Sequence, residues 1–449
     1  MAPLQRIAGL LWLLSVSIGP AFCQTTTDDG ADITMLTGTR SDVPKSSTGP
    51  PTGPYQTFSS RHTLATTSLP TDLGILTASY TETSSPNTLT YLTGSVTSSP
   101  TTTASSNNAT STSTSTAPPR PTNTRPCNNY PELCARKYSN MTQVGCHNSP
   151  FVRAGSAAAN QQFPVTSQLD DGVRFLQAQI QWPLPNSTVP HFCHTSCDLL
   201  DAGPITDWLG QVKDWVAAHP YDVVTILLGN GNYSTPDKYA KFIEESGITQ
   251  FVYTPAVVPM ALDDWPTLGQ LILSGQRVVM FLDYMANQTA YPWLMDQFSQ
   301  MWETPFDPVD PAFPCTVQRP PDLKPEDAKK RLYLMNHNLN AEVSVLGQSI
   351  LVPAVSQLNV TNAVEGNGSL GMAAGNCRAD WGRAPNILNV DYYNFGSYPG
   401  SVFEVAARMN NVSFEKRPCC GPEVGAGVRV EVVRSFVWMG LAWMAWVMV

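Results

Sequence analysis

The chain has 449 residues, only 14% of them charged, and a formal net charge of −9. This length fits one barrel with extensions or two to three average domains. The acidic balance and the lack of a basic stripe exclude a typical nucleic-acid binder and docking on an anionic membrane through a polybasic patch.

The first quarter of the chain has the composition of targeting and stalk segments. Residues 1–23 combine Arg6, an apolar run from Leu10 to Val16 and a small-residue end at Cys23, which predicts a signal peptide. The apolar run is too short for a membrane span, which needs about 20 residues. Residues 24–126 are rich in Ser, Thr and Pro, so we predict a disordered, O-glycosylated stalk, with an unmodified linker as the alternative.

From Cys127 to Phe414 the sequence alternates strand and helix patterns, which is typical of an α/β domain. In the strand that ends at Gln181, Leu176, Ala178 and Ile180 share one face. We expect strands at 173–181, 222–228, 277–283, 332–337 and 386–391, and helices at 204–218, 235–247 and 401–409. This alternation over 127–414 fits one closed barrel rather than two domains.

The last segment, 415–449, resembles a lipid-anchor signal. Small residues at 425–427 precede a short polar stretch and an apolar tail over 436–449. This is the pattern of glycosylphosphatidylinositol (GPI) attachment, in which the tail is removed. A short transmembrane or amphipathic tail is the alternative, although the tail is too short to span comfortably.

Cysteines and glycosylation sequons also indicate an extracellular chain. Ten cysteines behind a secretory start predict disulfides rather than a zinc site. We pair Cys127 with Cys134, Cys193 with Cys197, and Cys315 with Cys377, and leave Cys146, Cys419 and Cys420 unassigned. Eight N-glycosylation sequons support secretion, at Asn108, Asn140, Asn186, Asn232, Asn287, Asn359, Asn367 and Asn411.

Two histidine segments carry the candidate chemistry. His147 follows a short apolar run and precedes polar residues, as expected at the end of a barrel strand, where barrel enzymes place catalytic groups. His191 and His194 lie in a second such segment. Cleavage of a phosphodiester needs one proton removed and one donated, and two histidines can supply both near neutral pH. We predict that the two segments face each other across one pocket.

The motifs Gly145-Cys146-His147-Asn148-Ser149, Gly172–Leu176, Cys193-His194-Thr195 and Asp222–Asn230 follow one another in this order. They resemble the phosphatidylinositol-specific phospholipase C X-domain-like phosphodiesterases, in particular the secreted fungal type, over residues 127–414. The resemblance implies a TIM-type (β/α)8 barrel, possibly irregular, and hydrolysis of a phosphoinositide-like or related phosphodiester.

By this resemblance His147 is the general base and His194 the general acid, with His191 as an alternative acid. Asp391, at the tip of the last strand, is our candidate for orienting the base. The candidate substrate-binding residues are Asn148, Gln177, Gln179, Asp283 and His337. For Asp283 and His337, hydrogen bonding to the backbone alone is an equal alternative.

The sequence departs from the family at Gln177 and Gln179. Calcium-dependent relatives carry carboxylates there and near Gly229, and calcium needs charged oxygen ligands, so we predict no metal and no cofactor. Metal-free bacterial relatives place an aspartate and a phosphate-neutralising arginine on this strand, and losing such a charge can cost a few kcal/mol of barrier. Possible replacements are Arg153, Arg174 and Lys213.

These departures leave a second hypothesis, a non-catalytic barrel that binds lipid or glycan at the cell surface. A secreted adhesin without a pocket is a third. We expect a secreted protein, anchored to the membrane or cell wall by lipid, whose partner is a phospholipid or another phosphodiester. The sequence does not set an oligomeric state.

Overall fold

The structure is a computed structural model that describes residues 53–56, 58, 60–64, 126–184, 186–345, 348–417 and 419–420. The predicted signal peptide, most of the predicted stalk and the apolar C-terminal tail lie outside the described residues. Within the described residues, no helix is both long and apolar enough to cross a membrane.

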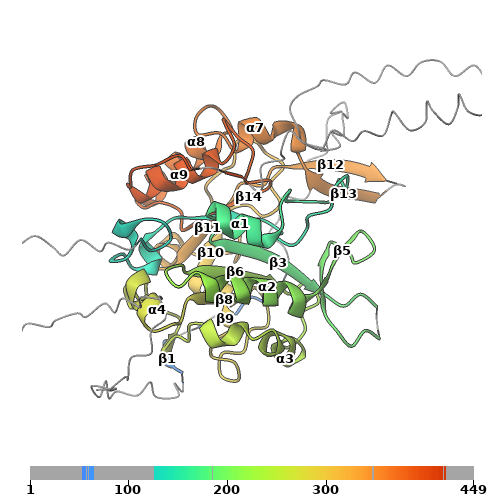
Figure 1. Cartoon of the computed structure of the whole chain (residues 1–449), viewed down its shortest axis with the longest axis vertical. Coiled ribbons are helices and arrows are strands. Elements are labelled where there is room, and N and C mark those ends of the chain that lie inside the picture. Colours follow the sequence, from blue (N-terminus) through green and yellow to red (C-terminus); the bar gives the residue numbers. More distant parts are fainter. Residues whose placement is uncertain are drawn as a thin grey trace, which may run out of the picture. The chain divides into compact units, whose positions relative to one another are not determined.

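Eight parallel strands form one curled sheet at the centre of the domain (Figure 1). In sheet order they are β10 (Met301–Glu303), β11 (Leu332–Asn336), β14 (Ile387–Val390), β2 (Gln143–Cys146), β3 (Phe175–Gln181), β6 (Val224–Gly229), β8 (Val278–Leu282) and β9 (Met295–Asp296). The two end strands, β9 and β10, do not pair with each other within the described chain. The prediction of an irregular TIM-type barrel is confirmed, and the irregularity is an open seam between β9 and β10.

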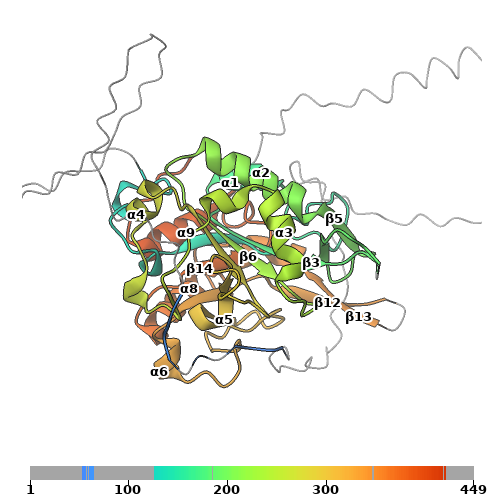
Figure 2. The ribbon, with the colours of Figure 1, turned by 90° about the horizontal axis from the view of Figure 1, so that it is seen from below.

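Helices lie outside the curled sheet (Figures 1 and 2). They are α1 (Val165–Asp171), α2 (Ile205–Ala218), α3 (Asp237–Glu245), α4 (Leu268–Leu273), α5 (Gln297–Gln300), α6 (Pro325–Ala328), α7 (Leu358–Thr361), α8 (Leu370–Trp381) and α9 (Ser401–Asn410). Short 3-10 helices are η1 (Pro131–Leu133), η2 (Tyr138–Asn140), η3 (Ile248–Phe251), η4 (Leu262–Asp264) and η5 (Val355–Gln357). The helices expected over 204–218, 235–247 and 401–409 are α2, α3 and α9, with ends that differ by one or two residues.

Helix α2 shows why this layer forms. Its buried stripe runs from Ile205 to Val216 and belongs to the same apolar cluster as Leu176, Ala178 and Ile180 of β3. The outward face of β3 is therefore the apolar one, as its alternation indicated. Each large side chain buried in this layer stabilises the fold by roughly 1.5–3 kcal/mol.

The side chains inside the barrel change from apolar to polar along the strands. Its N-terminal half is apolar, with Phe175, Leu227 and Ile387 in one buried cluster. Glycine is needed at position 145 of β2, because a Cβ there would lie 2.7 Å from the Phe175 ring. Two residues further along β3 the interior side chain is Gln177, so the polar half begins where the strands approach their C-terminal ends.

Two hairpins project from the C-terminal end of the strands, toward the right of Figures 1 and 2. One is formed by β4 (His191–His194) and β5 (Leu200–Pro204), with β4 antiparallel to the end of β3; the other by β12 (Asn340–Val345) and β13 (Gln348–Pro353). The setting of His194 therefore differs from that of His147, because His194 lies on a hairpin and not at the tip of a barrel strand.

Part of the predicted stalk contacts the barrel. His62–Thr63 forms a strand, β1, that pairs antiparallel with β7 (Val257–Val258). No strand pattern had predicted this contact.

The structure contains disulfides between Cys127 and Cys134, Cys193 and Cys197, and Cys315 and Cys377, the same three pairs that we assigned. Cys419 and Cys420 are bonded to each other, and Cys146 is a buried free thiol. Seven of the eight sequon asparagines lie on described residues, and all seven are exposed; Asn108 lies outside the described residues.

Candidate active site

His147 and Asp391 form a buried pair at the C-terminal end of two neighbouring strands. β2 and β14 are parallel, and Cys146 lies opposite Val390, so the residues that follow them are adjacent. The His147 backbone N–H donates to the Val390 carbonyl at 2.9 Å. Nδ1 of His147 lies 2.8 Å from Oδ1 of Asp391. This is the orientation expected of a carboxylate that fixes a catalytic imidazole.

Two side chains of the loop after β2 hold this pair in place. The Asn160 amide donates to Oδ1 of Asp391 at 2.9 Å. The Gln161 amide donates to the backbone carbonyls of His147, at 2.8 Å, and Val390, at 3.0 Å. Both side chains are buried. The sequence analysis missed them, because amide side chains in a loop carry no spacing signal.

The electrostatics of His147 favour its protonated form. Burial lowers the pKa of the ring, but the charge and hydrogen bond of Asp391, with the charges of Asp307 and Glu303, outweigh burial and raise the pKa above its ordinary value of 6.5. Within the described part of the chain, the hydrogen-bond contact of Nε2 is with the Asn338 amide nitrogen, at 3.5 Å. This nitrogen is therefore the one that can exchange a proton with a substrate.

His194 is also buried, but its environment favours the neutral form. Its ring meets the edge of Phe151 at a centroid distance of 5.2 Å, and Nδ1 lies 3.1 Å from Oγ1 of Thr195. Burial first, and then the charge of His147, lower the pKa of His194 to about 4. The charge of His147 therefore contributes to the lowered pKa of His194, which couples the two histidines electrostatically.

The two pKa shifts have opposite directions. The raised pKa of His147 and the lowered pKa of His194 favour a proton on His147 over one on His194, whereas the resemblance implied a neutral base at His147 and a protonated acid at His194. The two arrangements carry the same number of protons, so the proton must move within the pair before catalysis in the predicted direction.

His191, the alternative acid, is tied to its own hairpin. Its Nδ1 lies 2.9 Å from both carboxylate oxygens of Asp201, and the pair is half-buried. This pairing gives His191 a role in joining β4 to β5.

Three candidate substrate-binding residues follow β2 or lie on β3. Asn148 is buried directly after His147, and its Oδ1 makes no hydrogen bond within the described part of the chain. Gln177 accepts a hydrogen bond from the Asn389 amide at 2.8 Å. Gln179 lies over Gly229, where an added Cβ would approach its Oε1 to 2.3 Å. Gly229 therefore leaves the space that Gln179 occupies.

Asp283 and His337 make their hydrogen bonds within the protein. Oδ1 of Asp283 accepts from the Asn230 backbone at 2.7 Å, and burial raises the pKa of Asp283 to about 6. Nε2 of His337 donates to the Thr361 carbonyl at 2.9 Å, and burial lowers the pKa of His337 to about 3. This geometry supports the backbone-bonding alternative for both.

A buried cation that the sequence analysis missed lies beside Asp283. Arg319 is 3.0 Å from Glu303 and 3.5 Å from Asp283 in ion pairs, and it donates to the Tyr284 hydroxyl at 2.8 Å. Two carboxylates thus offset its single charge, which leaves little for a substrate phosphate. The half-buried Asp307 interacts with two cationic groups: the charges of His147 and Arg319 both act to lower its pKa, against the effect of burial.

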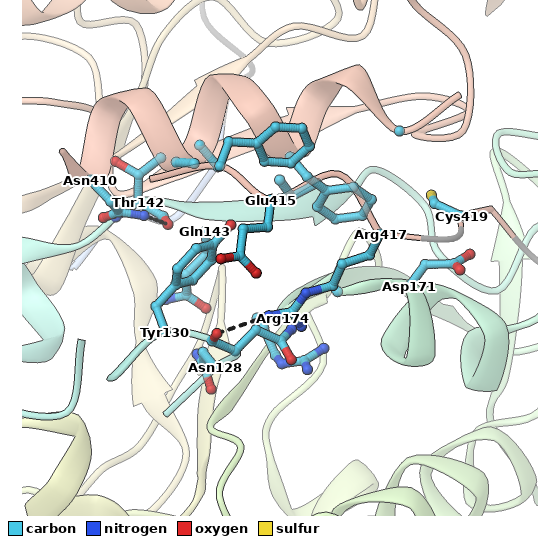
Figure 3. A pocket seen from close by; sticks show the side chains of 18 of the residues that line it. Asn128, Tyr130, Thr142, Gln143, Asp171, Arg174, Asn410, Glu415, Arg417 and Cys419 are labelled. Carbon is cyan, nitrogen blue, oxygen red and sulfur yellow. Dashed lines mark hydrogen bonds between the residues drawn. The ribbon is translucent and has the colours of Figure 1, made fainter. Parts of the chain in front are cut away.

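Of the three cations suggested for the phosphate, only Arg153 lies in the loop that follows His147. It is exposed and donates to the Asp201 carbonyl at 3.2 Å. Lys213 pairs with Asp214 on α2. Arg174 pairs with Asp222 and lines a separate hollow by the N-terminal end of β2, walled partly by Glu415 and Arg417 (Figure 3). Arg174 and Lys213 are therefore poor candidates for neutralising the phosphate.

The disulfide between Cys193 and Cys197 encloses His194 in a five-residue loop, and Thr195 adopts a left-handed φ of 51°. With His194 in its predicted role as general acid, replacing both cysteines by serine is expected to lower kcat about tenfold or more, because small displacements of a catalytic group are costly. The loss of stability should be about 2 kcal/mol, since the closed loop is short. Steady-state kinetics and thermal unfolding measure the two effects.

The matched control removes the disulfide between Cys127 and Cys134, which lies in the apolar cluster at the other end of the barrel. That change should lower stability and leave kcat within about twofold. Equal kinetic losses in the two double variants would contradict a specific role for the His194 loop.

The fold and the residues gathered at its C-terminal end define a barrel of the phospholipase C-like phosphodiesterase class. The sequence model of the PI-PLC X family matches residues 133–410, and the chain belongs to this family.

Relatives span most of the chain. An "uncharacterized secreted protein" of Arthroderma benhamiae is 48% identical over 424 residues, which cover 92% of this chain and 91% of the relative. The "PI-PLC X domain-containing protein 1" of the same organism is 39% identical over 288 residues, covering 64% of this chain and 90% of the relative. A phosphatidylinositol-specific phospholipase C variant from Staphylococcus aureus matches in structure with a TM-score of 0.41 and 14% identity, covering 61% of this chain and 94% of that one.

Proposed function

We propose that this chain is a phosphoric diester hydrolase of the phospholipase C type that acts on a phosphoinositide-like or related phosphodiester. The observation that carries the proposal is the buried His147–Asp391 pair, coupled electrostatically to the buried His194. Two imidazoles that share one proton are what a phosphodiester cleavage needs.

In the proposed reaction Nε2 of His147 takes the proton of the attacking hydroxyl, while Asp391 stabilises the imidazolium that forms. The attacking oxygen forms its bond to phosphorus as the bond to the leaving oxygen breaks, and His194 donates a proton to that oxygen. A bound phosphodiester anion beside His194 raises the pKa of that ring. Substrate binding thereby supplies the transfer of the proton from His147 to His194.

The acceptors around His147 favour a hydroxyl-rich head group. Oδ1 of Asn148, Oδ1 of Asn338 and Oδ2 of Asp391 are buried and make no hydrogen bond within the described residues. Asp307 adds a carboxylate nearby. Buried acceptors are stabilised by donors, and the hydroxyls of a polyol such as inositol are donors.

We propose that the reaction needs no metal, because Gln177 and Gln179 offer neutral amides where a hard dication requires charged oxygens. We also propose secretion and lipid anchoring at the cell surface. The disulfides, the exposed sequons and the secreted relative support secretion. The anchoring proposal rests on the sequence of the C-terminal tail.

The second function, a non-catalytic barrel that binds a lipid or glycan, is favoured by one observation. Arg319, a buried cation whose charge lowers the pKa of Asp307, is offset by Glu303 and Asp283. A phosphate would then rely on neutral amides, which bind without strongly stabilising a transition state.

The deciding experiment uses the full chain produced in a secretory host and vesicles that contain phosphatidylinositol. We expect release of inositol phosphates that is unchanged by EDTA. Release that EDTA abolishes would contradict the metal-free mechanism. Binding to the vesicles by a folded chain, without product from phosphatidylinositol, GPI glycolipid or glycerophosphodiesters, would favour the binding function.

A further inference from the structure

A segment from the Ser/Thr-rich N-terminal region packs on the barrel domain near its open seam. β1 pairs His62 with Val258 and Thr63 with Val257. The Leu64 backbone N–H donates to the Ala256 carbonyl at 2.9 Å, and the Leu64 side chain is buried. The segment thus forms a two-stranded antiparallel sheet with β7, separate from the barrel sheet.

Tyr55 anchors the other end of the segment. Its ring packs edge-on against Phe298, with centroids 4.8 Å apart, and against Tyr284, with centroids 5.4 Å apart. The hydroxyls of Tyr55 and Tyr284 are 3.3 Å apart. The neighbouring Gln56 amide donates to the Ala286 carbonyl. Aromatic contacts of this geometry add to the gain from burial alone.

The contacted residues lie in connections on the β9 side of the seam and in the connection that joins its two strands. Tyr284 and Ala286 follow β8, and Phe298 lies in α5, which connects β9 to β10. The segment also pairs with β7, and Arg61 forms an ion pair with Asp264 at 2.5 Å. Tyr55 therefore packs on the connection between the two strands that do not pair, β9 and β10.

The anchor also reaches the buried charge cluster. Tyr284, against which Tyr55 packs, accepts the hydrogen bond of Arg319. Phe298, the other ring in contact with Tyr55, lies under the Arg319 guanidinium, whose centre is 4.8 Å from the ring centroid. Tyr55 thus covers two of the side chains that keep Arg319 away from water.

We propose that residues 53–56 and 60–64 belong to an intrachain strap that packs on its own barrel at the connection between β9 and β10. The part of the chain that packs on the barrel then begins near residue 53 and not at Cys127. Docking in the same chain is favoured because a tether holds the strap at an effective concentration on the order of millimolar. The proposal does not depend on catalysis.

The test is hydrogen–deuterium exchange of the full chain, with thermal unfolding beside it. We expect the peptide that contains residues 62–64 to exchange at least about tenfold more slowly than the Ser/Thr tract over 101–116. Tyr55→Ala should remove this protection, speed exchange over 256–258 and lower Tm by about 3–8 °C. Tyr55→Phe should retain both the protection and the Tm.

Tyr91→Ala is the matched control, because Tyr91 is a tyrosine of the same Ser/Thr-rich tract outside the strap. It should leave exchange and Tm unchanged. Exchange over 62–64 as fast as in the tract, or a Tyr55→Ala chain that matches the Tyr91→Ala chain, would overturn the proposal. Protection that appears only with a concentration-dependent dimer in gel filtration would overturn docking in the same chain.

Discussion

Replacement of His147 by alanine is expected to lower kcat on a phosphodiester by at least about 10³-fold, while the fold is retained. The imidazole contacts Asp391 through Nδ1, and its Nε2 lies 3.5 Å from the Asn338 amide nitrogen. Without it, the attacking hydroxyl has no base and Asp391 has no ring to orient. Single-turnover and steady-state rates measure the loss, and circular dichroism and thermal unfolding verify the fold.

His219→Ala is the matched control. His219 ends α2, stacks on Trp215 and lies 4.0 Å from Asp170, so it is a histidine with a nearby carboxylate outside the proposed site. Its replacement should change kcat by less than about twofold. A His147→Ala protein that retains the wild-type rate would show that the pair is structural and would leave the binding function as the better account.

Much of the barrel could be predicted from the sequence, because its strands and helices are encoded by local periodicity. The alternation over 176–181 distinguished the outward apolar face from the inward glutamines. The apolar stripe of α2 was visible in the helical spacing of its residues. The proximity of His147 and Asp391 could also be predicted from the sequence. Both residues follow strands, and the strands of a parallel barrel present their C-terminal ends at the same rim.

The remaining parts of the site depend on contacts that the sequence order does not contain. Arg319 and Glu303 are brought together by a bridge between a loop and β10, and neither has a spacing that marks it. The directions of the pKa shifts of the two histidines could not be predicted for the same reason. Burial is the largest cause of the lowered pKa of His194, and the carboxylates around His147 raise the pKa of that ring.

The strap did leave a trace in the sequence. Tyr55, Phe58, Arg61, His62 and Leu64 fall within one stretch of a tract otherwise dominated by Ser, Thr and Pro. Aromatic and charged residues so concentrated give a short segment enough surface to bind a folded neighbour, although not enough to fold alone. Average composition over 24–126 hid this local departure.

The pH dependence of kcat/KM is expected to be bell-shaped, with its acid limb near pH 4 and its alkaline limb above pH 6.5. Below about 4 both rings are protonated, because that is the pKa of His194, and the base is lost. Above the raised pKa of His147 both rings are neutral, and the acid is lost. Because kcat/KM reports the free enzyme, these limits follow from the resting protein whichever ring acts as the acid.

Asp391→Asn should then lower kcat/KM by about 10²–10⁴-fold and move the alkaline limb to lower pH. Without the Asp391 charge, burial lowers the pKa of His147 with less opposition, so the singly protonated pair persists over a narrower range. Asp201→Asn provides the comparison, because Asp201 pairs with His191 at 2.9 Å on the hairpin and should leave the limb in place. An alkaline limb that moves with Asp201→Asn and not with Asp391→Asn would assign the proton to His191. The catalytic pair would then be built on the hairpin and not on the barrel rim.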